Sequence, residues 1–399
     1  MWTASSLPGL LAGLLLALDS LLRFGLVCLR AMKPPVRAGL IRVASPGCIV
    51  LIAAKDEAGM IGETVTAVLP QLTEWPGSRL WVVADNCADA TASEAAAAGA
   101  CVASRKNGRL GKGAVIAWWL QNHQADWKDK DSVLVLDADS RLSAGSLAAL
   151  KTAMECGADA AQAFVAPQAD SSSGRLAGWS EILMQRIDDE ARCGQGWQVP
   201  LRGTGMAIRA ELLAELAPKL HTLAEDLELD VLLAARQAKV VFVPEAMVID
   251  PKPELSSGAA RQRARWLRGQ LQVLRDYWRE IGRSLLNGGL SAWFLLPLLF
   301  LRPKTLLIGL RLVIVLAIAG WQYIFSIKGS PVGQMFLPVW SAAGIGLLLD
   351  VAYYLAAVRV VDDPRKYLAD LLAAPRYVVM WMYSFGVMTV RRGWLKARG

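Results

Sequence analysis

Long apolar runs near both ends of the chain place the strongest limit on how it can fold. Residues 7–29, 305–325 and 336–358 each approach the ~20 apolar residues with which a helix crosses a bilayer. Residues 45–280 between these runs have the composition of a soluble domain. We therefore predict an N-terminal transmembrane anchor and basic linker in residues 1–44, a soluble domain in 45–285, and a C-terminal region of membrane helices in 286–399.

Basic residues beside the apolar runs indicate how the chain is oriented in a membrane. Positive charges concentrate on the cytoplasmic side of membrane proteins, which places the soluble domain in the cytoplasm of a multi-pass protein of the inner (cell) membrane. The charges behind this prediction follow the first and the third run: Arg30, Lys33, Arg37 and Arg42, then Arg359, Arg365 and Lys366. Within the first run, Asp19 and Arg23 are one helical turn apart, and we expect them to pair.

Two further apolar stretches, residues 290–301 and 368–390, contain Trp or Tyr and are interrupted by Pro297, Pro375 and Arg376. Interrupted helices with aromatic residues suit the membrane interface. The second stretch is also long enough to span the bilayer, and that alternative stays open. The basic residues between 391 and 398 favour the interfacial position, because they are then cytoplasmic.

Composition narrows the class of protein further. The chain is 54% apolar and carries 43 Lys+Arg against 35 Asp+Glu, a net charge of +8. This charge suits the anionic face of a lipid bilayer as well as nucleic acid, but no DNA- or RNA-binding pattern accompanies it, so we expect no nucleic acid. Six scattered cysteines and two histidines, His123 and His221, lack metal-ligand spacing, which argues against a zinc site or a disulfide framework.

The soluble region alternates short β-rich runs with helical stretches, the pattern of an α/β fold. Buried strands are predicted at residues 48–53, 80–84, 132–136 and 240–243. Two of these runs lead directly into aspartates, Asp85 and Asp137, and the carboxyl ends of parallel strands form the ligand-binding edge of such sheets. After Asp85, Thr91 and Glu94 have the spacing of a capping box that begins a helix ending at Ala98.

Two acidic motifs are candidates for chemistry. Asp137-Ala138-Asp139 places two carboxylates at a strand end, where they can hold a divalent cation and leave positions for phosphate oxygens, or only end the strand as a polar loop. Glu225-Asp226 precedes an apolar helix, where it supplies either a catalytic carboxylate or only an acidic first turn favoured by the helix dipole. The residues alone leave both alternatives open.

Glycine-rich and basic motifs accompany these acids. Gly111-Lys112-Gly113 places a lysine between two permissive glycines at a predicted helix start, which suits an anionic ligand. Gly203-Thr204-Gly205 allows the close approach of a substrate, or forms only a tight turn. Residues 261–268 hold four arginines and a tryptophan, a cluster that suits phosphate and sugar binding or contact with anionic lipid.

The order and spacing of these motifs resemble the family 2 glycosyltransferases with a GT-A fold, especially the membrane-embedded synthases of the cellulose, hyaluronan and poly-N-acetylglucosamine type. The resemblance covers about residues 48–275. That family has three aspartate motifs followed by QxxRW, matched here by Asp85, Asp137-Ala138-Asp139, Glu225-Asp226 and Gln262-Arg263-Ala264-Arg265-Trp266. The opening strand motif ends in Asp56-Glu57, where the family commonly has Asn-Glu.

The resemblance implies a role for each matched position. Asp226 would be the catalytic base, while Asp137 and Asp139 would place Mg²⁺ or Mn²⁺ on the diphosphate. Glu57, Asp85 and Lys112 would lie at the nucleotide base. The nucleotide-sugar would be bound by Glu57, Asp85, Lys112, Asp137, Gln262 and Arg265, and the acceptor by Gly203, Thr204, Gly205, Glu225 and Trp266.

The implied reaction is metal-dependent hexosyl transfer to an acceptor hydroxyl, usually from a UDP-sugar. One base without an enzymic nucleophile means single displacement, which inverts an α-linked donor to a β-linked product. The leading prediction is a β-linked glycan for export, as in exopolysaccharide or capsule synthesis, and a homo-oligomer or an export partner is compatible with it. The alternatives are transfer of a single sugar to a polyprenyl-linked, ceramide or hopanoid lipid, since three crossings are few for a polymer channel, and a non-catalytic nucleotide- or glycan-binding membrane subunit.

Overall fold

A mixed β-sheet forms the centre of the computed structural model, which describes residues 7–32, 43–169, 171–251, 257–325, 331–372 and 374–390. In the described residues its strands follow the order β3-β2-β1-β4-β7-β6-β8-β5. Neighbours from β3 to β4 are parallel, β7 is antiparallel to both β4 and β6, β6 and β8 are parallel, and β5 is antiparallel to β8. The strands are β1 (Cys48–Ala54), β2 (Arg79–Asp85), β3 (Cys101–Arg105), β4 (Ser132–Asp137), β5 (Arg141–Leu142), β6 (Ala160–Gln168), β7 (Met206–Arg209) and β8 (Val240–Pro251).

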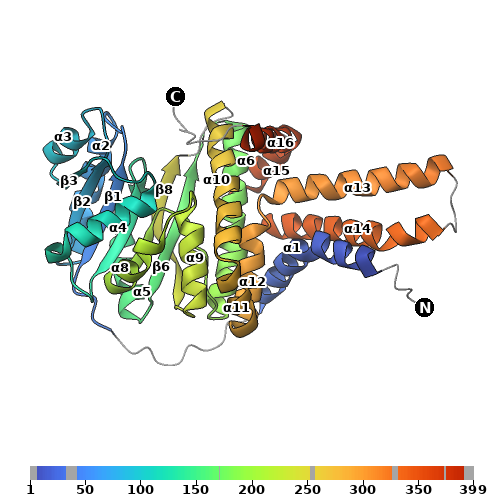
Figure 1. The fold of residues 1–399 in the computed structure, drawn as a ribbon, viewed down its shortest axis with the longest axis horizontal. Helices are drawn as coiled ribbons and strands as arrows, with labels where there is room; N and C mark the ends of the chain where they lie inside the picture. The colour runs from blue at the N-terminus through green and yellow to red at the C-terminus, as the bar shows by residue number, and fades with distance from the viewer. Residues whose placement is uncertain are drawn as a thin grey trace.

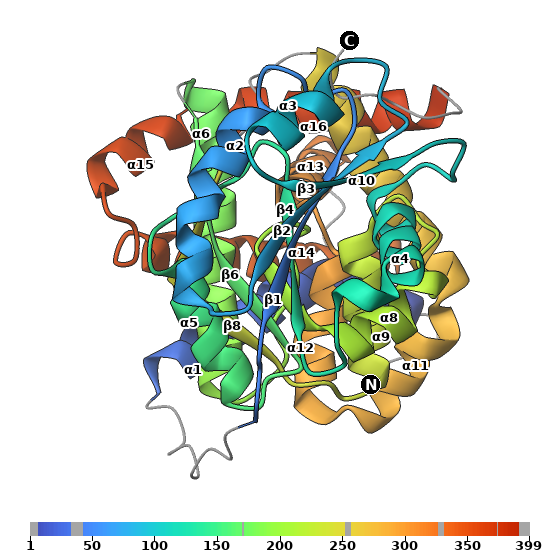
Figure 2. The same ribbon diagram turned by 90° about the vertical axis from the view of Figure 1, so that its left-hand side faces the viewer.

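Helices cover both faces of this sheet (Figure 2). In β1, Cys48, Val50 and Ile52 pack on one face against α2 (Ile61–Val68), α3 (Thr91–Ala97) and α5 (Ser146–Glu155). Ile49 and Leu51 point the other way, against α4 (Lys112–Asn122), α8 (Ala210–Leu216) and α9 (Glu225–Ala235). Because both faces are buried, the parallel strands are apolar throughout rather than alternating.

The predicted strands are present, and the sheet is larger than the sequence indicated. The run at 240–243 extends to Pro251, and the strands β3, β5, β6 and β7 were not predicted. The alanines in β6 (AAQAFVAPQ) explain one omission, because alanine is a weak strand former.

The predicted capping box at Thr91 and Glu94 is wrong. The helix begins at Thr91 and ends at Ala97, and the preceding residue, Ala90, makes no side-chain cap. The Glu94 carboxylate instead accepts a hydrogen bond from the backbone N–H of Gly59, with an N···O distance of 2.6 Å. The spacing of Glu94 from Thr91 suits a helix cap, but the N–H that donates to Glu94 comes from the loop that contains Gly59.

Helices from both ends of the chain form the other half of the molecule. In Figure 1, α13 and α14 extend away from the sheet as a hairpin with α1 beside α14, while α10 and α12 lie between this hairpin and the sheet. The helices of this half are α1 (Leu7–Ala31), α6 (Ser172–Leu183), α7 (Glu190–Gly194), α10 (Ser257–Asp276), α11 (Trp278–Asn287), α12 (Gly289–Phe300), α13 (Lys304–Phe325), α14 (Pro331–Ala357), α15 (Pro364–Leu371) and α16 (Ala374–Val390).

Three helices of the described residues are long and apolar enough to cross a membrane: Leu11–Ala31, Lys304–Trp321 and Pro338–Ala357. These are the three predicted runs. The helix α12 is too short for the same criterion, and the stretch predicted at 368–390 is divided between α15 and α16. Lys33, Arg37, Arg42 and the basic residues beyond 390 lie outside the described residues.

The expected pair between Asp19 and Arg23 is wrong. Arg23 donates to Asp188 on the π-helical turn Met184–Asp189 that follows α6, and Asp19 accepts from Arg311 of α13. Arg311 also donates to Asp350 of α14, at 2.6 Å. Each charge therefore meets a partner on a different segment, and these buried pairs join α1, α13 and α14 to one another and to the turn after α6.

Candidate active site

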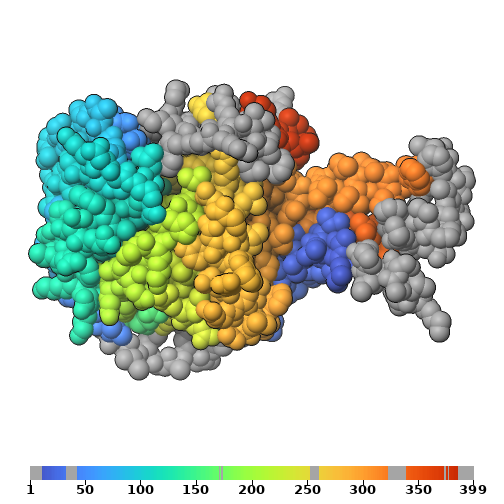
Figure 3. All heavy atoms as spheres, in the orientation of Figure 1, coloured from blue at the N-terminus to red at the C-terminus, as the bar shows by residue number. Residues whose placement is uncertain are grey.

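One cavity of about 560 Å³ runs from the carboxyl ends of β1, β2 and β4 to the membrane-side helices. Figure 3 shows that the outer surface on one side of this region is formed by the segments around α9, α10 and α12. Almost all the predicted site residues line the cavity: Glu57, Asp85, Lys112, Asp137, Asp139, Gly203, Thr204, Glu225, Asp226, Gln262, Arg265 and Trp266.

Gly205 is the exception, and it has a structural role. Its φ of +67° favours glycine, and an added Cβ would lie 2.8 Å from a side-chain atom of Val248 and 3.1 Å from Ala163. Gly205 therefore allows close packing beneath the cavity floor. The neighbouring Thr204 accepts a hydrogen bond from the Asp137 backbone N–H through its hydroxyl, at 3.2 Å, which holds the loop against the end of β4.

Asp85 marks one end of the cavity, at the carboxyl end of β2. Its buried carboxylate accepts from the guanidinium of Arg105 at 2.7 Å and from the amide of Asn86 at 2.8 Å. These contacts fix the direction of the side chain. Glu57 lies nearby on the loop after β1, where its backbone N–H donates to the Thr91 hydroxyl at 2.8 Å.

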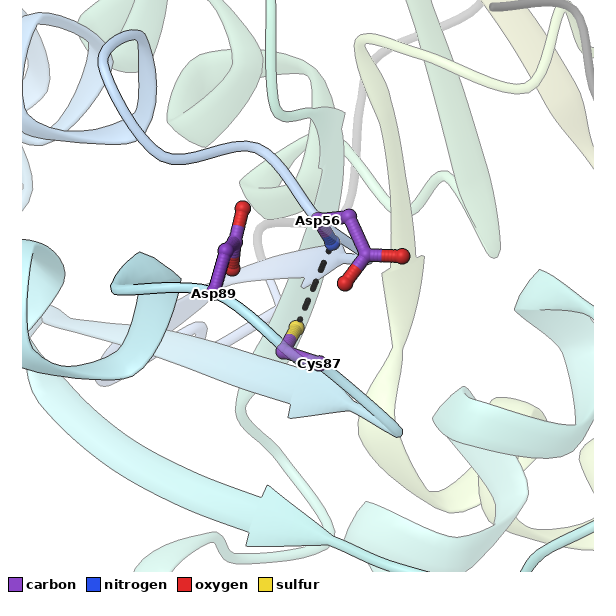
Figure 4. A group of neighbouring side chains, drawn as sticks. All are labelled: Asp56, Cys87 and Asp89. Atoms are coloured by element: carbon purple, nitrogen blue, oxygen red, sulfur yellow. Dashed lines mark hydrogen bonds between the residues drawn. The ribbon is translucent and has the colours of Figure 1, made fainter. Parts of the chain in front are cut away.

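Hydrogen bonds join the loops after β1 and β2 next to the Asp85 end of the cavity. The backbone N–H of Asp56 donates to the sulfur of Cys87 at 3.4 Å, as the dashed line in Figure 4 shows. In return, the Asp56 carboxylate accepts from the N–H of Ala88 at 2.8 Å. Asp56 has a φ of +53°, a conformation that Asn and Asp tolerate better than most residues. Asp56 can therefore adopt the same loop conformation as the Asn that is common in the family at this position.

Three aspartates meet in the middle of the cavity. One carboxylate oxygen from each of Asp137, Asp139 and Asp250 lies within 4.8 Å of the others. Hard divalent cations prefer such oxygen ligands, so this group fits Mg²⁺ or Mn²⁺. Asp250 was not predicted, although the apolar run Met247–Val248–Ile249 that leads into it repeats the signal at Asp85 and Asp137.

Lys112 lies beside this acidic group, at the start of α4. Its ammonium contacts the Asp137 carboxylate at 2.5 Å and the Gly203 carbonyl at 2.6 Å. Burial lowers the pKa of Lys112, but the charges of Asp137 and Glu225 outweigh that effect and raise it overall. Lys112 is therefore a cation next to the carboxylates. The family resemblance had implied a place for it at the nucleotide base.

Glu225 and Asp226 form the first turn of α9 on the cavity wall. Burial and the charge of Asp226 raise the pKa of Glu225 to about 7. Burial also raises the pKa of Asp226, against the opposing effects of the Leu227 N–H and the cations Lys112 and Arg302. A carboxylate with a raised pKa is a stronger base, which suits removal of a proton from a hydroxyl.

The basic cluster on α10 lines the cavity and, through Arg263, also packs against another helix. Gln262, Arg263, Arg265 and Trp266 line the cavity. Arg263 is 4% exposed, and its guanidinium lies over the rings of Tyr377 and Trp381 of α16, 5.5 and 5.4 Å from their centroids. Sequence spacing alone does not reveal this additional contact of Arg263 with α16.

A sequence model of the family described as "Glycosyltransferase like family 2" matches residues 46–269. The chain belongs to this family. The predicted family is thereby confirmed. The acidic and basic residues described above line the cavity of a family 2 glycosyltransferase.

Two known proteins extend the comparison. The chain is 26% identical over 281 residues to the beta-monoglucosyldiacylglycerol synthase of Synechocystis sp. (strain ATCC 27184 / PCC 6803 / Kazusa), a match that covers 64% of this chain and 56% of that protein. The chain thus spans little more than half the length of this relative. The mannosyltransferase PcManGT from Pyrobaculum calidifontis, solved in complex with GDP-Man and Mn²⁺, is 15% identical, with a TM-score of 0.52 and coverage of 96% of this chain and 98% of that chain. This second likeness confirms the predicted α/β fold of GT-A type.

Proposed function

We propose that this glycosyltransferase transfers a single sugar from a nucleotide diphosphate sugar to a hydroxyl of a membrane lipid. The observation that carries the proposal is the extent of the cavity, which joins the acidic group at Asp137 to side chains of two candidate membrane spans and of α16. Lys304, Tyr353 and Tyr377 line that second end. An acceptor anchored in the bilayer reaches the reaction centre from there, in an inner-membrane protein whose soluble domain faces the cytoplasm.

The donor end is assigned to the nucleotide-sugar, with a UDP-sugar as the expected donor. Asp85 and Glu57 contact the base. Asp137, Asp139 and Asp250 would hold Mg²⁺ or Mn²⁺, which would supply positive charge for the leaving diphosphate. Lys112 contributes a second positive charge at that place, and Gln262 and Arg265 approach from α10. The structural neighbour PcManGT, solved with GDP-Man and Mn²⁺, supports a nucleotide diphosphate sugar and a divalent metal at this end.

Asp226 is the proposed catalytic base. It accepts the proton of the acceptor hydroxyl as that oxygen bonds to the anomeric carbon of the sugar, while the bond from that carbon to the diphosphate breaks. The displacement is single because the reaction uses a base and no enzymic nucleophile, so the configuration at the anomeric carbon inverts. Glu225, Gly203, Thr204 and Trp266 then border the acceptor.

The named relative also favours a lipid acceptor, since its name describes a product made from diacylglycerol. Transfer to a growing exported glycan stays a prediction. Three candidate spans among the described residues are few for a channel that conducts a polymer. A purely binding subunit has no need of the complete acid set from Asp85 to Asp226, which favours the enzyme.

The test is to incubate the full-length protein, purified in detergent with added membrane lipids and Mg²⁺ or Mn²⁺, with a panel of radiolabelled UDP- and GDP-sugars. We expect label in one organic-extractable lipid, and no label with Asp226→Asn or with EDTA. Asp129→Asn, which changes an exposed loop residue, is the matched control for loss of a carboxylate. A ladder of lengthening glycans would overturn the lipid proposal, and no transfer from any donor would overturn the enzyme.

A further inference from the structure

The cavity continues beyond Asp226 to an end that contains cationic side chains of the membrane-side half. Asp226 and Arg302 both line it, and Arg302 lies in the segment between α12 and α13. Two residues further along, Lys304 contacts Asp350 of α14 at 3.3 Å, so this segment lies at the membrane-side end of the cavity. The metal-binding carboxylates lie at the other end, near the ends of β4 and β8.

Most cations in this part of the molecule are already matched by carboxylates. The ion pairs join Arg23 to Asp188, Arg192 and Arg202 to Asp189, and Arg311 and Lys304 to Asp350. Arg302 differs from all of these. Among the described residues its guanidinium has no carboxylate at ion-pair distance, and its buried Nε donates no hydrogen bond.

A second cation that lines the cavity also has buried donors without a hydrogen-bond partner. Arg263 also lines the cavity, and its buried Nε and Nη1 donate no hydrogen bond within the described residues. Burial, together with repulsion from Arg202 and Arg23, lowers the pKa of Arg302 to about 10. Arg302 nevertheless stays cationic at neutral pH. A desolvated cation of this kind is stabilised by an anion that enters the cavity.

We propose that Arg302 binds the phosphate of a phospholipid acceptor, next to the headgroup hydroxyl that Asp226 deprotonates. This inference rests on the proposed function and names the class of its acceptor. We assign Arg302 to the acceptor because the three aspartates and Lys112, which would meet the donor diphosphate, lie near the strand ends, whereas Arg302 lies on the segment that leads into α13. A guanidinium forks onto two phosphate oxygens, so it fixes the orientation of the headgroup as well as its charge.

This geometry distinguishes between lipids that carry a hydroxyl. Phosphatidylglycerol offers a hydroxyl and a nearby phosphate, and so it meets Asp226 and Arg302 together. Diacylglycerol offers the hydroxyl alone. A polyprenyl phosphate offers a phosphate oxygen as the nucleophile, which is already ionised and leaves the base at Asp226 without a proton to remove.

The experiment compares sugar transfer to phosphatidylglycerol, diacylglycerol and polyprenyl phosphate, each in phosphatidylcholine vesicles that contain the full-length protein. We expect phosphatidylglycerol to be the best acceptor. Arg302→Gln should raise its KM about tenfold or more, the effect of losing a hydrogen bond to a charged group, and leave the KM for the donor unchanged. Arg302→Lys should recover only part of the loss, because lysine restores the charge but not the two-point contact. Arg79→Gln, which removes an exposed arginine paired with Asp126, is the matched control and should behave as wild type.

Better transfer to diacylglycerol or polyprenyl phosphate, or an equal loss on all lipids in Arg302→Gln, overturns the inference. If no lipid receives sugar, the proposed function fails. A measurement of lipid binding then tests the Arg302 site separately from catalysis. In native mass spectrometry from detergent, wild type should retain phosphatidylglycerol in preference to diacylglycerol, and Arg302→Gln should lose that preference. Equal retention by the two proteins contradicts a phosphate site at Arg302.

Discussion

The two halves of this glycosyltransferase are built in different ways. The donor half is the β-sheet with the helices on its two faces, and the membrane-side half consists of the helices around α1, α13 and α14. In the donor half, Asp85, Asp137 and Asp250 each lie at the end of their own strand, and the sheet brings the three strand ends to one cavity. In the membrane-side half, charged side chains meet across long separations in the chain, as Arg23 and Asp188 do over 165 positions. The donor half is thus organised by backbone topology, and the membrane-side half by individual ion pairs.

This difference has a consequence for function. A sheet edge tolerates the change of one side chain because hydrogen-bonded strands hold the others in place. A buried ion pair leaves an uncompensated charge when one partner is lost. Variants in the donor half should therefore impair chemistry with little effect on folding, whereas variants in the membrane-side half should impair packing and acceptor use together.

The largest expected effect concerns the base. Asp226→Asn should reduce transfer about 10²–10⁴-fold, since the amide cannot accept the proton of the acceptor hydroxyl. Binding of UDP with Mn²⁺, measured by calorimetry, should stay close to wild type. If UDP binding is lost as well, Asp226 belongs to the donor site and the division between the two ends of the cavity is wrong.

The next effect concerns the attachment of α1. Arg23→Gln leaves the buried Asp188 carboxylate without its partner and should destabilise the protein by about 3–5 kcal/mol, measured by denaturant unfolding in detergent. The double variant Arg23→Met/Asp188→Leu should recover most of that loss. Arg30→Gln, on the same helix but in a partly exposed pair with Glu190 at 2.9 Å, is the matched control and should cost less than about 1 kcal/mol. Equal effects of the two single variants would remove the distinction between buried and exposed pairs.

A smaller effect is expected at the metal group. Asp250→Asn should weaken Mn²⁺ binding at least ~10-fold, the loss seen even when groups that support a metal's ligands are changed. The readout is the Mn²⁺ concentration that half-saturates UDP binding. Unchanged Mn²⁺ affinity would show that Asp137 and Asp139 suffice and that β8 contributes no ligand.

The smallest effect is a pH dependence at Glu225. Its pKa in the folded protein is about 7, above the ordinary value of 4.5, so the folded state favours the neutral carboxyl. This contribution to stability is complete below about pH 4.5 and is lost as the pH rises through 7. Because the side chain is partly exposed, solvent limits the change to about 1 kcal/mol, or about 2–4 °C in a domain of this size. Metal-free wild type should lose this much relative to Glu225→Gln between pH 5 and 8, whereas parallel profiles would contradict the assignment.

The sequence predicted the donor half well because its signals are local. An apolar run ending in aspartate marks both the strand and the ligand-binding end, and the same rule applied beyond residue 243 would have identified Asp250. Lys112 was assigned to the base end because spacing indicates a helix start but not the direction of a long side chain. The Asp137 carboxylate and the Gly203 carbonyl decide that direction, and the second lies 91 positions away.

The membrane-side half was predicted only as a set of spans. Hydropathy identifies the helices, but it contains no information on which helix a buried charge faces. Asp19 and Arg23 have the spacing of a local pair, and each nevertheless pairs with a distant segment, because their side chains point to different neighbours in the assembled bundle. Arg302 carries no sequence motif at all, and its place beside Asp226 becomes visible only when the cavity is assembled.

The most direct test of the account is the structure of the full-length enzyme in lipid nanodiscs with UDP and Mn²⁺. We expect one continuous cavity, with the diphosphate and metal at Asp137, Asp139 and Asp250. A lipid headgroup should lie between Asp226 and Arg302, with its acyl chains leaving past Tyr377 and Trp381. A nucleotide bound away from the three aspartates, or a glycan leaving between the spanning helices with no lipid in the cavity, would contradict it.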